Sequence, residues 1–252
     1  MTHTRCRCCV PTCRSDTPSS VAARCSVAKL YGLDRTRFFN VSFRFGNSYR
    51  KPYFAPVCSL PYPEPMTVYD TLLGDVKLVR PKRFGDARGW FAEVFNSEAF
   101  ENLGLPSTFV QDNQSFSARG VLRGLHYQLG HPQGKLIRVL SGHIWDVAVD
   151  LRRDSPDFGR WAAFDLRPRT ADGELEMLWI PEGFAHGFLV LSESAEVLYK
   201  TTRGYYPPGE RSILWNDPDI GIQWPLDLLD GAEVSVSAKD AKGALLKDAE
   251  LP

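Results

Sequence analysis

Apolar and polar residues alternate in short runs along most of residues 66–215, and Gly, Pro, Asp and Ser separate the runs. A period of two residues is typical of strands that bury one face, and many short strands indicate a sandwich or barrel. One short helix is predicted at residues 96–103, with Asn96 or Ser97 as its N-cap. We therefore expect an all-β fold of jelly-roll type with a few short helices. After a strand-like opening at Met66, the predicted strands are 76–80, 90–95, 108–116, 121–128, 135–139, 143–151, 161–166, 177–180, 186–190, 197–201 and 213–215.

The stretch richest in candidate chemistry is GVLRGLHYQLGHPQGKLIR, residues 120–138. It predicts two strands separated by a turn at residues 129–134, and it places Arg123, His126 and Lys135 among branched and aromatic neighbours. An imidazole can take up a proton near neutral pH, and two cations can hold negative charge. Each residue alone is most simply explained as a solvent-facing side chain of a sandwich. The three together, beside the motifs below, predict one chemical centre.

The composition excludes several classes of protein. Apolar residues make up 43% of the chain, which is enough for a sizeable core, and no run of about 18 apolar residues could span a membrane. No glycine-rich nucleotide loop is visible. All six cysteines lie within residues 1–58, so the remainder is neither a disulfide scaffold nor a thiol enzyme. We expect a reducing, cytoplasmic location and neither a nucleic-acid nor a membrane partner.

Residues 1–65 differ from the rest of the chain in composition and in hydrophobic pattern. They hold ten Lys or Arg against three acidic residues and show no sustained period. A zinc site is one interpretation of the cysteines at residues 6–13, but a matching second half is missing. An Arg- and Ser-rich targeting peptide is another. We favour a disordered or non-native N-terminal extension, with Met66 as the genuine start of a domain over residues 66–252.

The motif PEGFAHGF at residues 181–188 has the PxGxxH form found in cupin barrels. It contributes His186. In metal-binding cupins an earlier strand supplies His-x-His, but here that strand has His126 alone, and His131 falls in the turn. Three or four converging ligands are needed to hold a metal ion. We therefore expect neither a metal nor another cofactor.

His126 is better interpreted as a base, with a carboxylate on its second nitrogen to fix the tautomer. Asp146, Asp150 and Asp240 are candidates by residue type, and spacing alone does not choose among them. Tyr199 could donate a proton from the opposite face, although a hydrogen-bonded core tyrosine is the commoner explanation.

Cations are the remaining candidates. Lys135 could stabilise an enolate oxygen, and its alternative is a solvated strand lysine. Arg88, Arg123 and Lys239 could grip a diphosphate through charge-assisted hydrogen bonds. The alternative for each of these three is a surface charge that contributes little.

From about Met66 to about Leu246, the chain resembles the dTDP-4-dehydrorhamnose 3,5-epimerase family, segment after segment in the same order. Residues 1–65 lie outside the resemblance. The segments that carry it include FGDARGWFAE (84–93), FVQDN (109–113), VLRGLHYQ (121–128), DVAVDLR (146–152), WIPEGFAHGF (179–188), VLYKTT (197–202) and SAKD (237–240).

The resemblance implies a cytosolic, metal-independent jelly roll of cupin type that works as a homodimer. Its substrate would be dTDP-4-dehydro-6-deoxy-glucose, inverted at carbons 3 and 5 on the way to dTDP-rhamnose. His126 would be the base, Asp240 its orienting carboxylate, Tyr199 the acid, and Lys135 the cation at the 4-keto oxygen. The residues implied to line the sugar site are Arg123, His186 and Tyr206. Those implied to hold the nucleotide and diphosphate, some across the dimer, are Arg88, Phe91, Glu93, Gln111, Asp112, Asn113, Glu210 and Lys239.

Two departures from the family pattern stand out, and neither removes a named residue. Gln114 replaces the usual histidine after Gln-Asp-Asn, and the link at residues 167–177 is longer and more acidic, which predicts a larger surface turn. Three alternative functions stay open. They are an epimerase that inverts one carbon only or acts on a related dTDP-4-keto sugar, a non-catalytic nucleotide-sugar-binding cupin, and a metal-dependent cupin oxygenase, which the missing His-x-His opposes.

Overall fold

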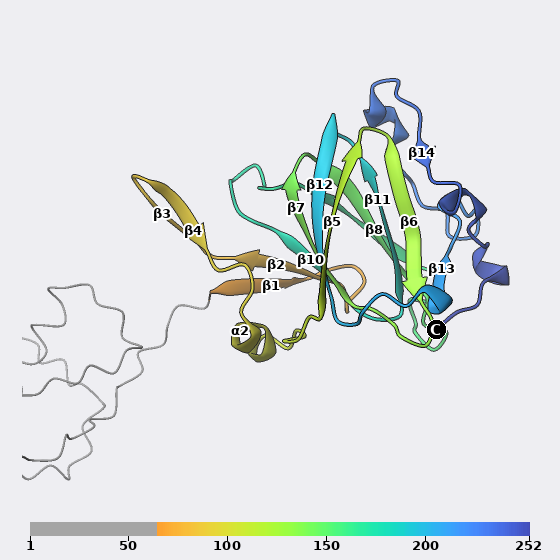
Figure 1. Ribbon diagram of the computed structural model, residues 1–252, viewed down its shortest axis with the longest axis horizontal. Helices are drawn as coiled ribbons and strands as arrows, with labels where there is room; N and C mark the ends of the chain where they lie inside the picture. Colours follow the sequence, from red (N-terminus) through yellow and green to blue (C-terminus); the bar gives the residue numbers. More distant parts are fainter. Residues whose placement is uncertain (1–64) are drawn as a thin grey trace, which may run out of the picture. The chain divides into compact units, whose positions relative to one another are not determined.

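The computed structural model describes residues 65–252, and they form two six-stranded β-sheets that face each other, with one small hairpin beside them (Figure 1). The first sheet has the order β1-β2-β10-β7-β12-β5. Its strands are β1 (Met66–Asp70), β2 (Lys77–Pro81), β10 (Met177–Ile180), β7 (Lys135–Ser141), β12 (Ser194–Thr201) and β5 (Gln111–Ala118).

The second sheet has the order β13-β6-β11-β8-β9, and a short parallel strand, β14, adds to β6. Its strands are β13 (Glu210–Ser212), β6 (Val121–Gln128), β11 (Phe184–Val190), β8 (Ile144–Asp150), β9 (Trp161–Leu166) and β14 (Ser235–Val236). The hairpin of β3 (Arg83–Asp86) and β4 (Gly89–Ala92) projects away from both sheets in Figure 1. The predicted all-β jelly roll is confirmed.

Apolar side chains from the inner faces of the two sheets fill the space between them. Ile137 and Val197 of the first sheet belong to the same buried cluster as Ala148 and Phe188 of the second. Each strand of such a sandwich contributes every second residue to the core. The core between the sheets follows this alternation, whereas β10 and β11 are buried at every position because other segments cover their second face.

The two strands predicted at residues 120–138 both form, but they do not pair with each other. β6 pairs with β11 and β13 in the second sheet, and β7 pairs with β10 and β12 in the first. The connecting turn at residues 129–134 therefore crosses from one sheet to the other. His126 and Lys135 consequently belong to opposing walls of the sandwich.

The predicted helix is α2 (Ser97–Asn102), and the side chain of Asn96 accepts a hydrogen bond from the Ala99 amide, which confirms Asn96 as the N-cap. The sequence of residues 237–246 also predicts a loop leading into a short helix, but short 3-10 turns form in this region instead. These and two earlier turns are η1 (Pro207–Gly209), η2 (Leu226–Leu229), η3 (Asp240–Lys242) and η4 (Leu246–Asp248).

Several strands differ from their predicted bounds, and β11 and β12 begin two and three residues earlier than expected, at Phe184 and Ser194. The strand expected at 213–215 lies at β13 instead, although Ile213 still exchanges backbone hydrogen bonds with Leu125 and forms an isolated bridge to Ala244. β5 begins at Gln111 rather than at residue 108, because its pairing with β12 begins at Gln111. β4 ends at Ala92 because the residues after it pack into a separate apolar cluster.

The larger surface turn predicted at residues 167–177 lies between β9 and β10. Arg80 donates to the carboxylate of Glu176 at 2.8 and 2.5 Å, and Arg83 donates to the Gly173 carbonyl at 2.5 Å. These contacts tie the turn to β2 and β3.

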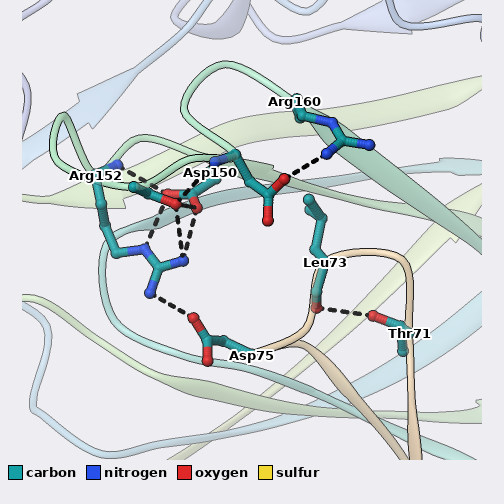
Figure 2. Close-up of polar contacts among 8 residues, drawn as sticks. Thr71, Leu73, Asp75, Asp150, Arg152 and Arg160 are labelled. Atoms are coloured by element: carbon teal, nitrogen blue, oxygen red, sulfur yellow. Dashed lines mark hydrogen bonds and ion pairs between the residues drawn. The ribbon is translucent and has the colours of Figure 1, made fainter.

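A polar network links the β1–β2 loop to the loop after β8 (Figure 2). Arg152 donates to both oxygens of the fully buried Asp150, at 2.9 and 2.6 Å, and to Asp75 at 2.6 Å. Ser155 adds a 2.6 Å hydrogen bond to Asp150. Burial opposes the ionisation of Asp150, but these hydrogen bonds outweigh it and hold the pKa of this carboxyl below its usual range. Asp150 is therefore a structural residue and not the partner of His126.

Within residues 65–252, no helix is long and apolar enough to cross a membrane. The zinc site, the targeting peptide and the disordered extension considered for the N-terminal region fall on residues 1–64, outside the described part of the chain.

Candidate active site

A local irregularity in β6 brings two of the predicted residues to one pocket. His126 pairs with His186 of β11, but Arg123 pairs with Phe188, so β6 uses one residue more than β11 over this interval. In a regular strand, side chains three residues apart point to opposite faces. The extra residue lets Arg123 and His126 line the same pocket of about 320 Å³.

The irregularity depends on close backbone contact between β6 and β11. Gly124 has φ +109°, and a Cβ there would lie 2.5 Å from the His186 carbonyl oxygen. A Cβ at Gly187 would lie 2.6 Å from the Arg123 carbonyl oxygen. Only glycine fits at this approach, which sets the relative position of the two histidines.

His126 is paired with Asp240, at 2.7 Å between Nε2 and Oδ1. The parallel pairing of β14 with β6 brings the chain back beside His126, and η3 then begins at Asp240. The Gly124 amide donates to Asp240 at 3.4 Å, and Ser237 accepts from the Asp240 amide. Burial disfavours ionisation of Asp240, but its hydrogen bond to His126 leads the interactions that hold its pKa below the usual range. Of the three carboxylates open at the level of sequence, the structure brings Asp240 to His126.

A second histidine–aspartate pair lies deeper between the sheets. His186 Nε2 lies 3.0 and 2.9 Å from the two oxygens of Asp146, and both residues are buried. Burial raises the pKa of the Asp146 carboxyl, and His186 and Lys135 act against that rise. This arrangement places Asp146, which sequence spacing left undecided, beside His186.

Lys135 approaches the two pairs from the opposite sheet. Its Nζ donates to the backbone carbonyl of His126 at 3.4 Å. Although part of the residue is accessible to solvent, burial lowers the pKa of Lys135 to about 8, with Asp146 and Glu182 opposing the shift. A lysine of this kind carries its charge at neutral pH and is a strong electrostatic partner for an anion.

Tyr199 extends from β12 of the first sheet, and its hydroxyl lies 2.7 Å from Ser115 Oγ. Burial raises the pKa of Tyr199 to about 12, while the hydrogen bond to Ser115 acts in the opposite direction. The Tyr199 ring centroid is 6.3 Å from that of His186. Tyr199 and Lys135 thus come from the wall opposite to His126.

Ser115 and Ser117 were missed at the level of sequence. They share one face of β5 with the predicted residues Gln111 and Asn113, because alternate residues of a strand point the same way. Gln111 donates to Asn113 at 2.8 Å, and Arg123 donates to Ser117 at 3.0 Å. The period of two, counted onward from Gln111, is the signal that could have found both serines.

Paired charges line the pocket, and aromatic residues that do not line it follow one another shortly before Glu210 in the sequence. Glu210 forms an ion pair with Lys239 and accepts a 2.6 Å hydrogen bond from Tyr205. The ring of Tyr206 stacks on His131, with 4.3 Å between centroids and 25° between planes. The residues that line the pocket are Val121, Leu122, Arg123, His126, Glu210, Ser235, Val236, Ser237, Lys239 and Asp240.

Of the predicted residues, Arg123, His126, Glu210, Lys239 and Asp240 line this pocket, and the others do not line it within one chain. Lys135, Tyr199 and His186 lie beside it through the contacts described above. Arg88 and Phe91 belong to the β3–β4 hairpin, where Arg88 pairs with Asp86 and lines a separate hollow of about 220 Å³. Glu93 follows the same hairpin. Asp112 occupies the outer face of β5 and pairs with Lys200 at 2.9 Å.

No group of three or more His, Cys, Asp or Glu side chains with metal-site spacing occurs among the described residues. The two histidines nearest to each other each contact one carboxylate instead.

A jelly roll with a histidine–aspartate pair, a tyrosine and a lysine between its sheets has the architecture of a cupin-type epimerase. A family model described as dTDP-4-dehydrorhamnose 3,5-epimerase matches residues 70–248. The chain belongs to the dTDP-4-dehydrorhamnose 3,5-epimerase family.

Individual relatives agree with this assignment. The dTDP-4-dehydrorhamnose 3,5-epimerase of Salmonella typhimurium is 52% identical over 188 residues, which cover 74% of this chain and 98% of that protein. The crystal structure of a dTDP-6-deoxy-D-glucose-3,5-epimerase from Legionella pneumophila, in complex with dTDP-4-keto-L-rhamnose, has a TM-score of 0.68 at 46% identity and covers 74% of this chain and 97% of that chain. The crystal structure of a 3'-monoepimerase from Streptomyces bikiniensis in complex with dTDP-quinovose has a TM-score of 0.62 at 32% identity. The match covers 71% of this chain and 87% of that chain.

Proposed function

We propose that this protein inverts carbons 3 and 5 of dTDP-4-dehydro-6-deoxy-glucose and yields dTDP-4-dehydro-rhamnose for dTDP-rhamnose biosynthesis. The observation that carries the proposal is the pair of His126 and Asp240 at 2.7 Å on one wall, opposite Tyr199 and Lys135 on the other. Membership of the epimerase family supports the same substrate class.

The chemistry requires a base, an acid and a cation. The 4-keto group acidifies the hydrogens on both flanking carbons, because the carbanion is delocalised as an enolate. His126 removes a proton from one face, and Tyr199 returns a proton to the other face, so the carbon is inverted with no net redox change. Asp240 holds the His126 ring and stabilises its charged form.

Lys135 holds the enolate oxygen. A charged donor aimed at an atom where negative charge develops is typically the largest single contribution to the rate of such a reaction, on the order of 3 kcal/mol. Because burial lowers the pKa of Lys135 to about 8, the lysine is protonated at neutral pH yet weakly solvated. Both properties strengthen its interaction with an anion.

The remaining predicted residues bind the substrate in this proposal. Arg123, His186 and Tyr206 contact the sugar. Lys239 and Glu210 form an ion pair at the pocket and bind the nucleotide and diphosphate. The other residues predicted to bind the nucleotide and diphosphate are Arg88, Phe91, Glu93, Gln111, Asp112 and Asn113.

We also propose that the protein acts as a homodimer in which the β3–β4 hairpin completes the site of a second copy. Phe91 is 69% exposed and Trp90 47% exposed on a hairpin that projects from the sheets (Figure 1). Exposed aromatic side chains on a projecting element are typical of an interface. Two-fold symmetry would bring the Arg88 of each copy to the pocket of the other.

Mixing two inactive variants tests the shared site. Arg88→Ala and His126→Ala should each lack activity alone, while a heterodimer contains one site with both residues intact. Equal mixing with subunit exchange should restore about a quarter of the wild-type rate, because half of the dimers are mixed and each has one working site. No recovery from a mixture that forms heterodimers would place Arg88 outside the partner's site.

The function itself is tested by solvent exchange in deuterated water on dTDP-4-dehydro-6-deoxy-glucose. The wild type should incorporate deuterium at carbons 3 and 5, and His126→Ala should incorporate none. His143→Ala is the matched control, because His143 forms a similar pair with Asp165 at 2.8 Å but does not line the pocket. A folded, nucleotide-binding wild type that exchanges neither carbon would leave the non-catalytic binding protein as the explanation.

A single-carbon epimerase is the second candidate, because a 3'-monoepimerase from Streptomyces bikiniensis has the same fold at 32% identity. The two candidates differ in the exchange pattern, since a mono-epimerase labels one carbon only. Metal content of the purified protein would separate both from a cupin oxygenase. We further propose a cytoplasmic location, which the absence of cysteine from residues 59–252 supports.

A further inference from the structure

The inner face of β5 presents a line of polar side chains to the site, and Ser115 is the one that contacts Tyr199. The two hydroxyl oxygens lie 2.7 Å apart, and either atom can donate. Ser115 is half-buried, whereas its neighbour Ser117 is buried and already accepts from Arg123. Among the described residues, Ser115 provides the hydrogen bond to the Tyr199 hydroxyl.

The proposed function places an unusual demand on Tyr199. Double epimerisation needs two proton deliveries for each substrate, and Tyr199 holds one acidic proton. After the first delivery a phenolate is left in a buried position, where burial raises the pKa of Tyr199 to about 12. The phenolate therefore needs a new proton before the second carbon can be inverted.

We propose that Ser115 is the positioning residue that returns this proton to Tyr199 between the two inversions. In the first step the Tyr199 O–H bond breaks as the new C–H bond forms on the sugar. In the second step the Ser115 O–H bond breaks as the Tyr199 O–H bond re-forms, and Ser115 takes a proton from water at the same time. Before the second inversion His126 also releases to solvent the proton that it took from the sugar, which neutralises the hydroxide left by the donating water, so that atoms and charges balance and both residues are ready to act again.

The geometry favours Ser115 over the other polar groups near Tyr199. The His186 ring is 6.3 Å away between centroids, and its Nε2 is engaged by Asp146. Lys135 contacts the His126 carbonyl, on the opposite wall. Ser115 belongs to an edge strand, and its partial exposure gives its hydroxyl access to water.

The test compares Ser115→Ala with Ser115→Thr, because threonine keeps the hydroxyl and suits a strand position. Deuterium incorporation at each of the two carbons and the sugar products are measured under single-turnover conditions. In Ser115→Ala we expect exchange at the second carbon to fall roughly tenfold or more relative to the first, so that singly inverted sugar accumulates. Ser115→Thr should keep the wild-type ratio.

Two results would overturn the inference. The first is a Ser115→Ala variant in which exchange at the two carbons falls by the same factor, or does not fall at all. Either outcome would mean that the second proton reaches the substrate by another route. A Ser115→Thr variant as defective as Ser115→Ala would assign Ser115 a packing role. The inference rests on the proposed function, and the wild-type protein distinguishes a failure of the inference from a failure of that function. If the wild type exchanges no carbon or only one, the proposed double epimerisation itself is wrong.

Discussion

The two histidine–aspartate pairs are built from the same residue types but differ in solvent access. The His126 side chain is 34% exposed and that of Asp240 only 5%, so the imidazole faces the pocket while its carboxylate is enclosed. His186 and Asp146 are 6% and 0% exposed. A base must reach its substrate, and its orienting carboxylate works best away from water. This difference supports His126, rather than His186, as the base.

Asp240→Asn should remove the orienting charge while the side chain keeps its shape. We expect kcat to fall by about 10² to 10⁴ with little change in KM, because the amide can hold the wrong His126 tautomer. Steady-state kinetics and a thermal melt measure the two effects. Asp165→Asn, at the equivalent position beside His143, serves as the control, and equal rates in both variants would contradict a role for Asp240.

Lys135 should set the alkaline limb of the pH profile. Activity needs its charged form, so kcat/KM should decline as the pH rises through about 8, the lowered pKa of Lys135. The pKa of Tyr199, about 12, is too high to cause that decline. Lys135→Arg stays charged and should move the limb to higher pH, whatever its effect on the maximum rate. An unmoved limb would assign it to another group.

At the scale of elements, the contact between β6 and β11 sets the geometry of the site. One extra residue in β6 turns Arg123 to the same side as His126, and glycines at positions 124 and 187 permit the approach. The site therefore depends on a backbone feature that carries no reactive group.

Gly187→Ala should separate these two strands. Its Cβ would meet the Arg123 carbonyl at 2.6 Å, and such overpacking typically costs about 1–3 kcal/mol of unfolding free energy. Activity should fall together with stability, because His186 and Arg123 are displaced. Denaturant unfolding and kinetics are compared with Gly74→Ala, where a Cβ has nothing within 4 Å. Equal stability of the two variants would show that the strands adapt.

Alternation in the sequence was sufficient to predict most strands, and Asn96 was sufficient to predict the start of α2. The alternation did not predict which strands pair with each other. The turn at residues 129–134 suggested neighbouring strands, but the apolar residues of β6 and β7 are needed in different sheets. The strand near residue 213 was placed too late, because its ladder with β6 covers residues 210–212 and the apolar Ile213, which also packs against the C-terminal region, lies at the end of that ladder.

At the scale of the whole molecule, one network joins loops from both sheets. Arg152 holds Asp150, at the end of β8, and Asp75, between β1 and β2 (Figure 2). None of the residues in this network lines the pocket that contains His126. Its contribution should therefore be to stability and not to the chemical step.

Arg152→Ala should destabilise the fold by about 1–3 kcal/mol at neutral pH, because buried Asp150 loses its counter-charge while Arg152 itself is partly exposed. The folded-state pKa of Asp150 is depressed, so this stabilisation is present above the unfolded-state pKa and is lost as the pH falls through the folded-state value. The difference between variant and wild type should therefore shrink in acid. Arg160→Ala, which breaks an exposed pair with Asp157, is the control, and kcat should stay unchanged in both.

The composition of the site could be predicted better than its connections. Residue type and family resemblance singled out His126, Lys135 and Tyr199, and the resemblance also implied Asp240, but residue type and spacing alone did not separate Asp240 from Asp146 and Asp150. Asp240 reaches His126 only because β14 adds to β6 in parallel, an arrangement between distant segments that leaves no local signal. Ser115 was overlooked because a serine in a strand carries no motif of its own.

The crossing between β6 and β7 has a consequence for altering substrate range. In the proposed function the reacting sugar lies between two sheets whose spacing is set by hydrophobic side chains and not by the groups that would touch it. Phe188 packs within this layer, with ring centroids 6.3 Å from His186 and 6.4 Å from Tyr199. Shortening such a side chain opens space beside His186 and Tyr199 while every reactive group is kept. Tolerance for bulkier sugars can therefore be engineered from the interior of the protein, without any change at its polar surface.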